Sequence, residues 1–157
     1  MTLKEKIQED LNSAIKSKRE IETSTLRMLS AAILNKEKQK RYKSGKSEDI
    51  PLTDEEITEV VFNEVKKRKE AIELYEKGDR QELADKEKKE AEILQKYLPE
   101  QLTEEEVKKL VKEAIAKVGA KEQKDMGKVM AELMTQVKGK ADGGLVSKVV
   151  KELLAGR

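Results

Sequence analysis

Helix-start signals recur along this 157-residue chain and constrain its fold more than any other feature. Four segments place a Thr or Asp three residues before a Glu, at Thr2, Thr53, Asp79 and Thr103. In such a capping box the first side chain accepts a backbone N–H at the start of a helix, and the Glu accepts another. Apolar residues then recur every three or four positions, and we find no alternating run that predicts a strand. The sequence therefore predicts an all-α fold.

Seven helices are expected from these starts and from the glycines and prolines that interrupt the pattern. They run from Thr2 past Ile15, from about Glu20 to Tyr42, from Thr53 to Gly78, from Asp79 to Pro99, from Thr103 to Val118, from about Asp125 to Val137, and from Asp142 past Leu154. The segment "KSGKSEDIP" forms a loop after the second helix. The chain divides at Pro99 into a four-helix N-terminal part, residues 1–98, and a compact three-helix tail, residues 99–157.

Each expected helix has one apolar face, which we expect to be buried against its neighbours. The inward residues are Leu3, Ile7, Leu11 and Ile15; Leu26, Leu29, Ile33 and Leu34; Ile57, Val60, Val61, Val65, Ile72 and Tyr75; Leu83, Ile93, Leu94, Tyr97 and Leu98; Val107, Leu110, Val111, Ala114 and Ile115; Met126, Val129, Met130, Leu133 and Met134; and Leu145, Val146, Val149, Val150, Leu153 and Leu154. With only 3% aromatic residues, these faces form thin aliphatic layers rather than one deep core.

The composition narrows the possible chemistry. The chain has no Cys and no His, which excludes disulfides, thiolate catalysis and the commonest metal ligands and general bases. Its first helix carries Lys4, Glu5, Lys6 and Glu9, so it does not resemble a signal peptide, and no apolar run is long enough to span a membrane. We expect a cytoplasmic protein with no membrane partner.

No catalytic centre stands out among the many carboxylates. The densest cluster, "TDEEITE", begins at Thr53, where a helix start favours negative charge. No Ser or Thr has a His to activate it, and no glycine loop follows a strand to hold a nucleotide. We identify no catalytic residue, cofactor or metal site, and we do not expect a self-sufficient enzyme.

One stretch differs from the Glu- and Lys-rich helices around it. "KDMGKVMAELMTQVKGKADGGLV", from Lys124 to Val146, holds four of the eight glycines and three of the five methionines. In a structural interpretation, Gly127 lets two helices approach closely, and Gly139, Gly143 and Gly144 form a turn. In a functional interpretation, the helix start after Asp142 offers N–H groups to a phosphate, with lysines nearby. Periodicity alone favours the structural interpretation, because glycine in helical turns is ordinary.

Basic residues concentrate in two segments. Residues 27–46 hold seven basic side chains against one acidic, and residues 124–151 hold six lysines against Asp125, Glu132 and Asp142. The net charge of +2 is too small to identify a nucleic-acid-binding protein by itself.

The glycine stretch also resembles a known family. "VGAKEQKDMGKVMAELMTQVKGKADGGLVSKVVKELL", preceded by "YLPEQLTEEEV", closely resembles YqeY-like proteins, the stand-alone relatives of the tail of GatB. GatB is a subunit of the bacterial tRNA-dependent amidotransferase, which amidates Glu-tRNA(Gln) or Asp-tRNA(Asn). The resemblance covers essentially the whole chain, but only the segment from Asp125 to Gly143 is specific, and nothing matches the domain that performs the chemistry.

The resemblance implies a partner and a site. In the amidotransferase this tail lies against the outer corner of folded tRNA, which implies that tRNA is bound here through phosphate contacts. The candidate RNA-binding residues are Lys124, Gly127, Lys128, Lys138, Lys140, Gly143, Gly144 and Lys148. The alternative is an adaptor whose helices dock an aminoacyl-tRNA synthetase or an amidotransferase subunit. A catalytic contribution to amide transfer would rest on family association alone.

Overall fold

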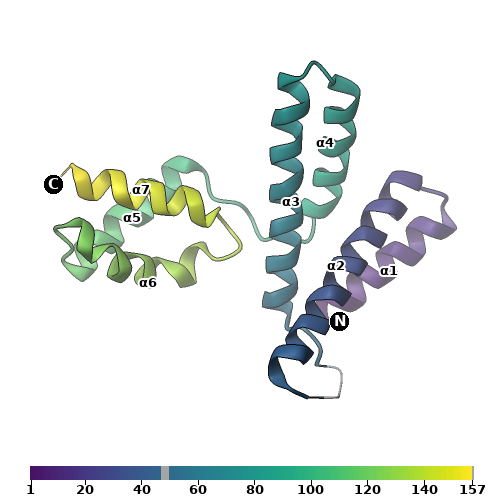
Figure 1. Ribbon diagram of the computed structural model, residues 1–157, viewed down its shortest axis with the longest axis horizontal. Helices are drawn as coiled ribbons and strands as arrows, with labels where there is room; N and C mark the ends of the chain where they lie inside the picture. The colour runs from purple at the N-terminus through teal and green to yellow at the C-terminus, as the bar shows by residue number, and fades with distance from the viewer. Residues whose placement is uncertain (47–49, 157) are drawn as a thin grey trace. The chain divides into compact units, whose positions relative to one another are not determined.

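The computed structural model describes residues 1–46 and 50–156, and within these ranges all regular structure is helical. The α-helices are α1 (Leu3–Lys16), α2 (Glu20–Ser44), α3 (Asp54–Lys77), α4 (Gln81–Gln95), α5 (Glu104–Val118), α6 (Met126–Val137) and α7 (Gly143–Ala155), with one 3₁₀ turn, η1 (Gln123–Asp125) (Figure 1). The all-α prediction is confirmed. Three residues of the expected loop after α2, Ser47, Glu48 and Asp49, lie outside the described residues.

The chain packs as two units, Met1–Leu98 and Pro99–Arg157, and the boundary falls at the proline that ends the fourth predicted helix. In the first unit, α1 and α2 form one helical hairpin and α3 and α4 form another (Figure 1). Its buried core residues are Ile7, Leu11, Leu26, Leu29, Ile33, Leu52, Ile57, Val60, Val61, Val65, Leu94 and Tyr97. This core is aliphatic except for the ring of Tyr97.

A buried ion cluster joins α3 to α4. The Arg68 side chain is 5% exposed, and its Nη1 donates to the backbone oxygen and the carboxylate of Glu64, each at 3.0 Å. Its Nε lies 3.5 Å from Glu90, whose side chain is 8% exposed. The nearby Glu87 has a raised pKa, chiefly because burial disfavours its charged form and then because Glu90 repels it. Charges this well buried are uncommon unless they are paired.

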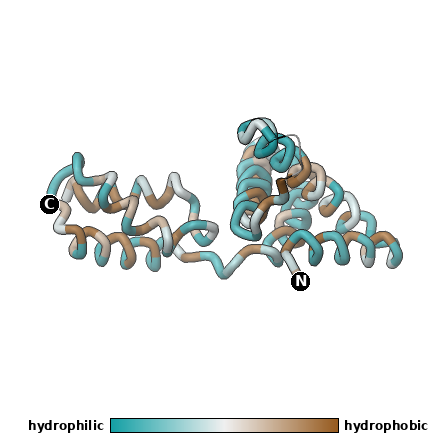
Figure 2. The backbone as a smooth tube through the Cα atoms, turned by 90° about the horizontal axis from the view of Figure 1, so that it is seen from below, coloured by the Kyte–Doolittle hydropathy of each residue, from teal (hydrophilic) through white to brown (hydrophobic). Residues whose placement is uncertain are grey.

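The second unit is a three-helix bundle around an aliphatic core. Its buried residues are Val107, Val111, Ala114, Ile115, Ala120, Val129, Leu133, Val137, Val146, Val149, Val150 and Leu154. In Figure 2 apolar and polar stretches alternate along the helices of this unit, as expected for helices with one buried face. A bundle of this size buries little apolar surface, so loops that tie its helix ends together contribute to its stability.

Most helix starts follow the capping prediction, and one does not. Thr2, Thr53 and Thr103 each form a complete capping box, and Asp142 accepts the N–H of Gly144 at the start of α7. The predicted cap at Asp79 is wrong. That residue has a φ of 56°, and α4 begins two residues later without a side-chain cap. Asp79 instead occupies the left-handed turn conformation, which Asp tolerates better than most residues.

Three predicted core residues lie on the surface. Ile15 is 43% exposed, Leu34 is 50% exposed and Met134 is 54% exposed. In α1 the buried residue next to Ile15 is Ala14, which continues the spacing of Ile7 and Leu11. One residue along a helix turns the side chain by about 100°, so a neighbour of a buried position often points to solvent. The other predicted inward residues are buried or partly buried.

Candidate nucleic-acid interface

The segment before α6 is held by the carboxylate of Asp125 and by a contact with α7. The Asp125 carboxylate accepts the backbone N–H groups of Lys121 and Glu122 at 3.0 and 3.2 Å. These two hydrogen bonds, the one from Lys121 first, lower the pKa of Asp125. The Gln123 side-chain amide donates to the backbone oxygen of Lys151 at 2.9 Å. The first turn of α6 therefore lies beside the last turns of α7, and the two helices are antiparallel (Figure 1).

One face of α6 is exposed and carries no carboxylate. The exposed residues opposite its buried Val129, Leu133 and Val137 recur at helical spacing. We call them the α6 outer face: Gly127, Lys128, Ala131, Met134, Thr135 and Lys138. The acidic residue of this helix, Glu132, lies at the edge and pairs with Lys117 of α5 at 2.5 Å. The face thus has a cation near each end, with Ala131, Met134 and Thr135 between them.

Gly127 does not serve helix packing. A Cβ built on Gly127 meets no heavy atom within 4 Å, apart from its chain neighbours and its own helix backbone. The structural interpretation of this glycine, as a point of close approach between two helices, is therefore wrong. Its exposed position on the α6 outer face leaves the backbone accessible from solvent.

The turn between α6 and α7 is held in place by the segment before α5. Gly139 has a φ of 75°, which glycine adopts without strain, so its predicted role as a turn residue is confirmed. Its backbone oxygen accepts the side-chain amide of Gln101 at 2.8 Å, and the oxygen of Lys140 accepts the N–H of Leu102 at 2.8 Å. The backbone of this turn is pinned, while the side chains of Lys138 and Lys140 are exposed.

The start of α7 is a poor phosphate site. Asp142 Oδ1 accepts the Gly144 N–H at 3.2 Å, and a Cβ on Gly144 would lie 3.5 Å from the same carboxylate. The negative charge of Asp142 occupies the position that an anion would take at a bare helix start. Gly143 and Gly144 form the first turn of α7, and an added Cβ at Gly143 would meet open space.

Five of the eight predicted site residues lie in two groups at opposite ends of α6. Lys124, Gly127 and Lys128 lie at its start, whereas Lys138 and Lys140 follow its end. Lys128 and Lys138 are ten residues apart, which corresponds to about 15 Å along a helix axis. The remaining members, Gly143, Gly144 and Lys148, belong to α7, where Lys148 is one turn from Gly144.

Two features reduce the positive potential of these groups. Lys124 Nζ lies 3.2 Å from a carboxylate oxygen of Glu122. The basic turn at Lys140 is hydrogen-bonded to Leu102, two residues before the acidic first turn of α5 at Glu104. Sequence reasoning grouped the lysines by proximity in the chain and missed Ala131, Met134 and this acidic neighbour. A helical projection of residues 126–138 groups Gly127, Ala131 and Lys138 on one side, but it does not show that this side is uncovered.

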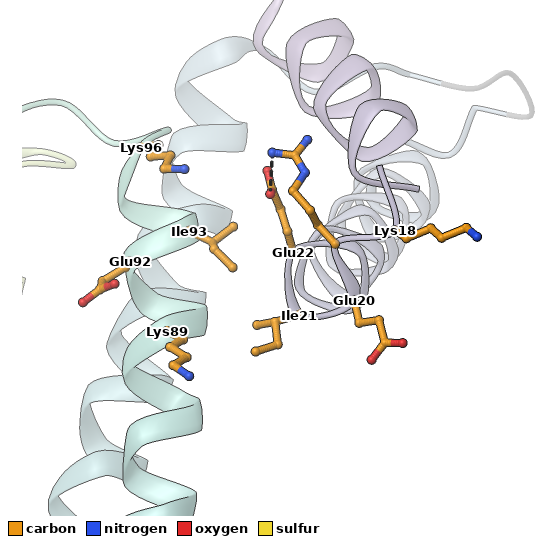
Figure 3. A pocket seen from close by; sticks show the side chains of 9 residues that line it. Lys18, Glu20, Ile21, Glu22, Lys89, Glu92, Ile93 and Lys96 are labelled. Carbon is orange, nitrogen blue, oxygen red and sulfur yellow. Dashed lines mark ion pairs between the residues drawn. The ribbon is translucent and has the colours of Figure 1, made fainter. Parts of the chain in front are cut away.

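A hollow in the first unit offers a second, less specific candidate. It lies between the start of α2 and α4, with Ile21 and Ile93 pointing toward each other across it (Figure 3). Its volume of about 600 Å³ is within the range of small-ligand sites. Its charged lining residues are of both signs, and the nearest pair, Arg19 and Glu22, is already joined at 3.0 Å. Nothing in this lining selects one ligand.

The described residues show neither a metal centre nor a membrane span. Within them, no group of three or more acidic side chains is arranged to hold a metal ion. Their helices also include none that is both long and apolar enough to cross a bilayer.

Comparison with known proteins covers nearly the whole chain. Residues 4–154 match the family described as YqeY-like protein. The chain is 31% identical, over 156 residues, to "Altered inheritance of mitochondria protein 41, mitochondrial" of Pyrenophora tritici-repentis, covering 97% of this chain and 81% of that protein. It is also 32% identical, over 94 residues, to "Uncharacterized protein C22F3.15" of Schizosaccharomyces pombe, covering 60% of this chain and 70% of that protein. The chain therefore belongs to the YqeY-like family.

Proposed function

We propose that the unit Pro99–Arg157 binds folded RNA, with tRNA as the favoured partner, through the α6 outer face and the turn that follows it. One observation carries the proposal: this exposed face has Lys128 near one end and Lys138 at the other, carries no carboxylate, and includes the small residues Gly127 and Ala131. Membership in the YqeY-like family supports it, because the resemblance to the GatB tail implies tRNA contact.

The chemistry of this face suits recognition of a backbone rather than of bases. Folded RNA presents phosphates and 2′-hydroxyls on its surface, and lysines neutralise phosphates as mobile point charges. The α6 outer face has no aromatic side chain on which a base could stack. Small side chains at Gly127 and Ala131 allow the RNA backbone to approach the helix closely.

The predicted residues contribute unequally. Lys128 and Lys138 are the main contacts, since they belong to the exposed face and neither forms an ion pair with a described carboxylate. The charge of Lys128 does interact with Asp125, whose pKa it helps to lower. Lys140 extends the contact along the turn, and Lys148 extends it onto α7. Lys124 contributes less because Glu122 lies 3.2 Å from its Nζ. Gly143 and Gly144 support the turn rather than binding phosphate, because Asp142 occupies their helix start.

We connect this function with tRNA-dependent amidation as an accessory activity, and we expect that the purified chain alone does not amidate Glu-tRNA(Gln).

The proposal also concerns the cellular compartment in which the protein acts. The sequence favours the cytoplasm, whereas the name of the Pyrenophora relative places that protein in mitochondria.

The test is binding of the full chain to unfractionated tRNA over a range of salt concentrations. The variant Lys128→Gln/Lys138→Gln should bind more weakly, and the slope of log affinity against log salt should fall by about one unit for each lost phosphate contact. The matched control is Lys109→Gln/Lys112→Gln, which removes the same charge from exposed lysines of α5 in the same unit. Equal binding by both variants would refute the assignment to the α6 outer face.

Docking to a protein is the second candidate, and Met134 favours it. This residue is 54% exposed in the middle of the α6 outer face, and an exposed methionine suits a protein partner better than a phosphate. Met134→Gln should leave tRNA affinity unchanged if RNA covers the face through its phosphates. Loss of a synthetase or amidotransferase subunit from co-purified material, with unchanged tRNA affinity, would favour the adaptor.

A further inference from the structure

The C-terminal end of α2 carries an exposed aromatic ring among cations, in the unit that the proposed function does not use. Tyr42 is 89% exposed, whereas Tyr97 is buried and Phe62 and Tyr75 are partly buried. It lines a hollow together with Lys38, Arg41, Lys43 and Lys46. Lys38 is four residues before Tyr42 and therefore lies on the same side of the helix.

This end of α2 is exposed because the helix extends beyond the starts of α1 and α3. Lys4, in the first turn of α1, pairs with Glu37 at 2.6 Å, so residues after Glu37 extend beyond the start of α1. Lys40 pairs with Glu56 in the first turn of α3 at 2.7 Å, so residues after Lys40 extend beyond the start of α3 as well. Among the described residues of the first unit, no helix packs over the last turn of α2.

These same ion pairs leave positive charge in excess. Two described carboxylates next to this end of α2, Glu37 and Glu56, are already paired with Lys4 and Lys40. Among the described residues, no carboxylate lies within ion-pair distance of Lys38, Lys43 or Lys46. Basic residues in the last turn complement the helix dipole, which explains some of this charge. The helix dipole does not account for the exposed ring of Tyr42. It also does not account for Lys38, one turn earlier, or Lys46, just after the helix.

We propose that this patch binds a single-stranded segment of nucleic acid, with one unpaired base stacked on the Tyr42 ring and the flanking phosphates on Lys38, Lys43 and Lys46. An aromatic ring offers a face to any base, and surrounding cations hold the backbone. In the described chain, Lys6 lies 5.9 Å from the centroid of the Tyr97 ring, but no cation covers the ring of Tyr42. Among the described residues the ring of Tyr42 is left uncovered, since this residue is 89% exposed.

The composition of the patch favours nucleic acid over a lipid surface. A helix that binds membranes places several large apolar side chains opposite its lysines. The residues lining this hollow include no large aliphatic side chain, and their aromatic residue carries a polar hydroxyl. A single tyrosine among cations fits one base and two or three phosphates.

The test measures binding of the full chain to fluorescent twelve-nucleotide oligo(U) and oligo(dU) at low salt. Tyr42→Ala should lower the affinity by about tenfold, the effect of removing one stacked base, with little change in the salt slope. Tyr42→Phe should keep most of the affinity. Lys38→Gln/Lys43→Gln should instead lower the slope by about 0.7 for each lost phosphate. A preference for one oligonucleotide would distinguish RNA from DNA as the source of the strand.

Matched controls separate this site from the α6 outer face. Lys16→Gln/Lys69→Gln removes the same charge from exposed lysines elsewhere in the first unit and should bind like the unaltered protein. Lys128→Gln/Lys138→Gln should affect folded tRNA but not the short single strand. Unchanged oligonucleotide affinity in Tyr42→Ala would overturn the proposal. So would binding to vesicles containing phosphatidylserine that depends on Tyr42 when oligonucleotide binding does not.

Discussion

Replacing Arg68 by Leu should destabilise the first unit severely, and the reason lies in the groups that the guanidinium serves. Its Nη1 donates to the backbone oxygen and the carboxylate of Glu64, and its Nε faces Glu90 at 3.5 Å. Both Arg68 and Glu90 are more than nine-tenths buried. Without the cation, Glu90 would remain a buried carboxylate with no guanidinium to compensate its charge. It would also lie near Glu87, whose charged form is already disfavoured by burial and by Glu90.

The expected loss is about 3–5 kcal/mol in the free energy of unfolding, the usual cost of removing one partner of a buried pair. For a unit of this size it corresponds to a fall of more than roughly 10 °C in the melting temperature. Exposed pairs such as Arg80–Glu82 provide the contrast, since solvent screens them and breaking one should hardly change the free energy of unfolding. Urea unfolding of the full chain, monitored by circular dichroism, would measure the stability lost in Arg68→Leu and the stability lost when an exposed pair is broken.

The stability of the first unit should depend on pH through Glu87. Its pKa is raised above the ordinary value of 4.5, so its contribution to stability is present at acid pH and is lost as pH rises through the folded-state pKa. Arg68 opposes this shift, so Arg68→Leu should raise the pKa of Glu87 further. The variant should therefore lose more stability near neutral pH than at mildly acid pH.

The double variant Arg68→Leu/Glu90→Leu tests the cause. Replacing a buried ion pair by apolar residues of similar size is often neutral or stabilising, so the double variant should recover most of the stability lost by Arg68→Leu. A double variant no more stable than Arg68→Leu would show that packing of the Arg68 side chain, and not the uncompensated charge, determines the loss. That result would refute the electrostatic argument.

Further predictions concern two glycines and one tyrosine. Gly127→Ala should raise the free energy of unfolding by up to about 1 kcal/mol, because the new methyl meets open space and alanine is the better helix former; Gly139→Ala should lower it by about 1–2 kcal/mol, because φ is 75° there. Urea unfolding checks both, and a destabilised Gly127→Ala would restore the packing interpretation. The pKa of Tyr97 is raised by burial and then by its hydrogen bond to Asp10, so stability should fall as pH rises above about 10, where the unfolded chain ionises first. Tyr97→Phe should make that alkaline fall shallower in melts between neutral pH and about pH 11, and an unchanged slope would contradict the assignment.

The sequence alone was sufficient for the helices and most of their ends. Capping boxes at Thr2, Thr53 and Thr103 are satisfied within four residues of chain, so they form wherever the helix lies. Asp79 shows the limit of that reasoning. The same residue pattern is present, but the tight link between α3 and α4 requires a left-handed residue there, and Asp79 has a φ of 56°.

Burial and the shape of the candidate surface were decided by tertiary packing. Ile15, Leu34 and Met134 each lie one residue beyond a buried position, at the edge of an apolar face. Each is exposed because burial of such an edge position depends on whether another helix lies opposite. The same holds for Gly127, whose surroundings are open, and for Tyr42, which is exposed because α2 extends past the starts of α1 and α3. Helix formation and capping act over a few residues and can be inferred from the order of amino acids. Which side of a helix is covered depends on segments far apart in the chain, and only the folded structure brings them together.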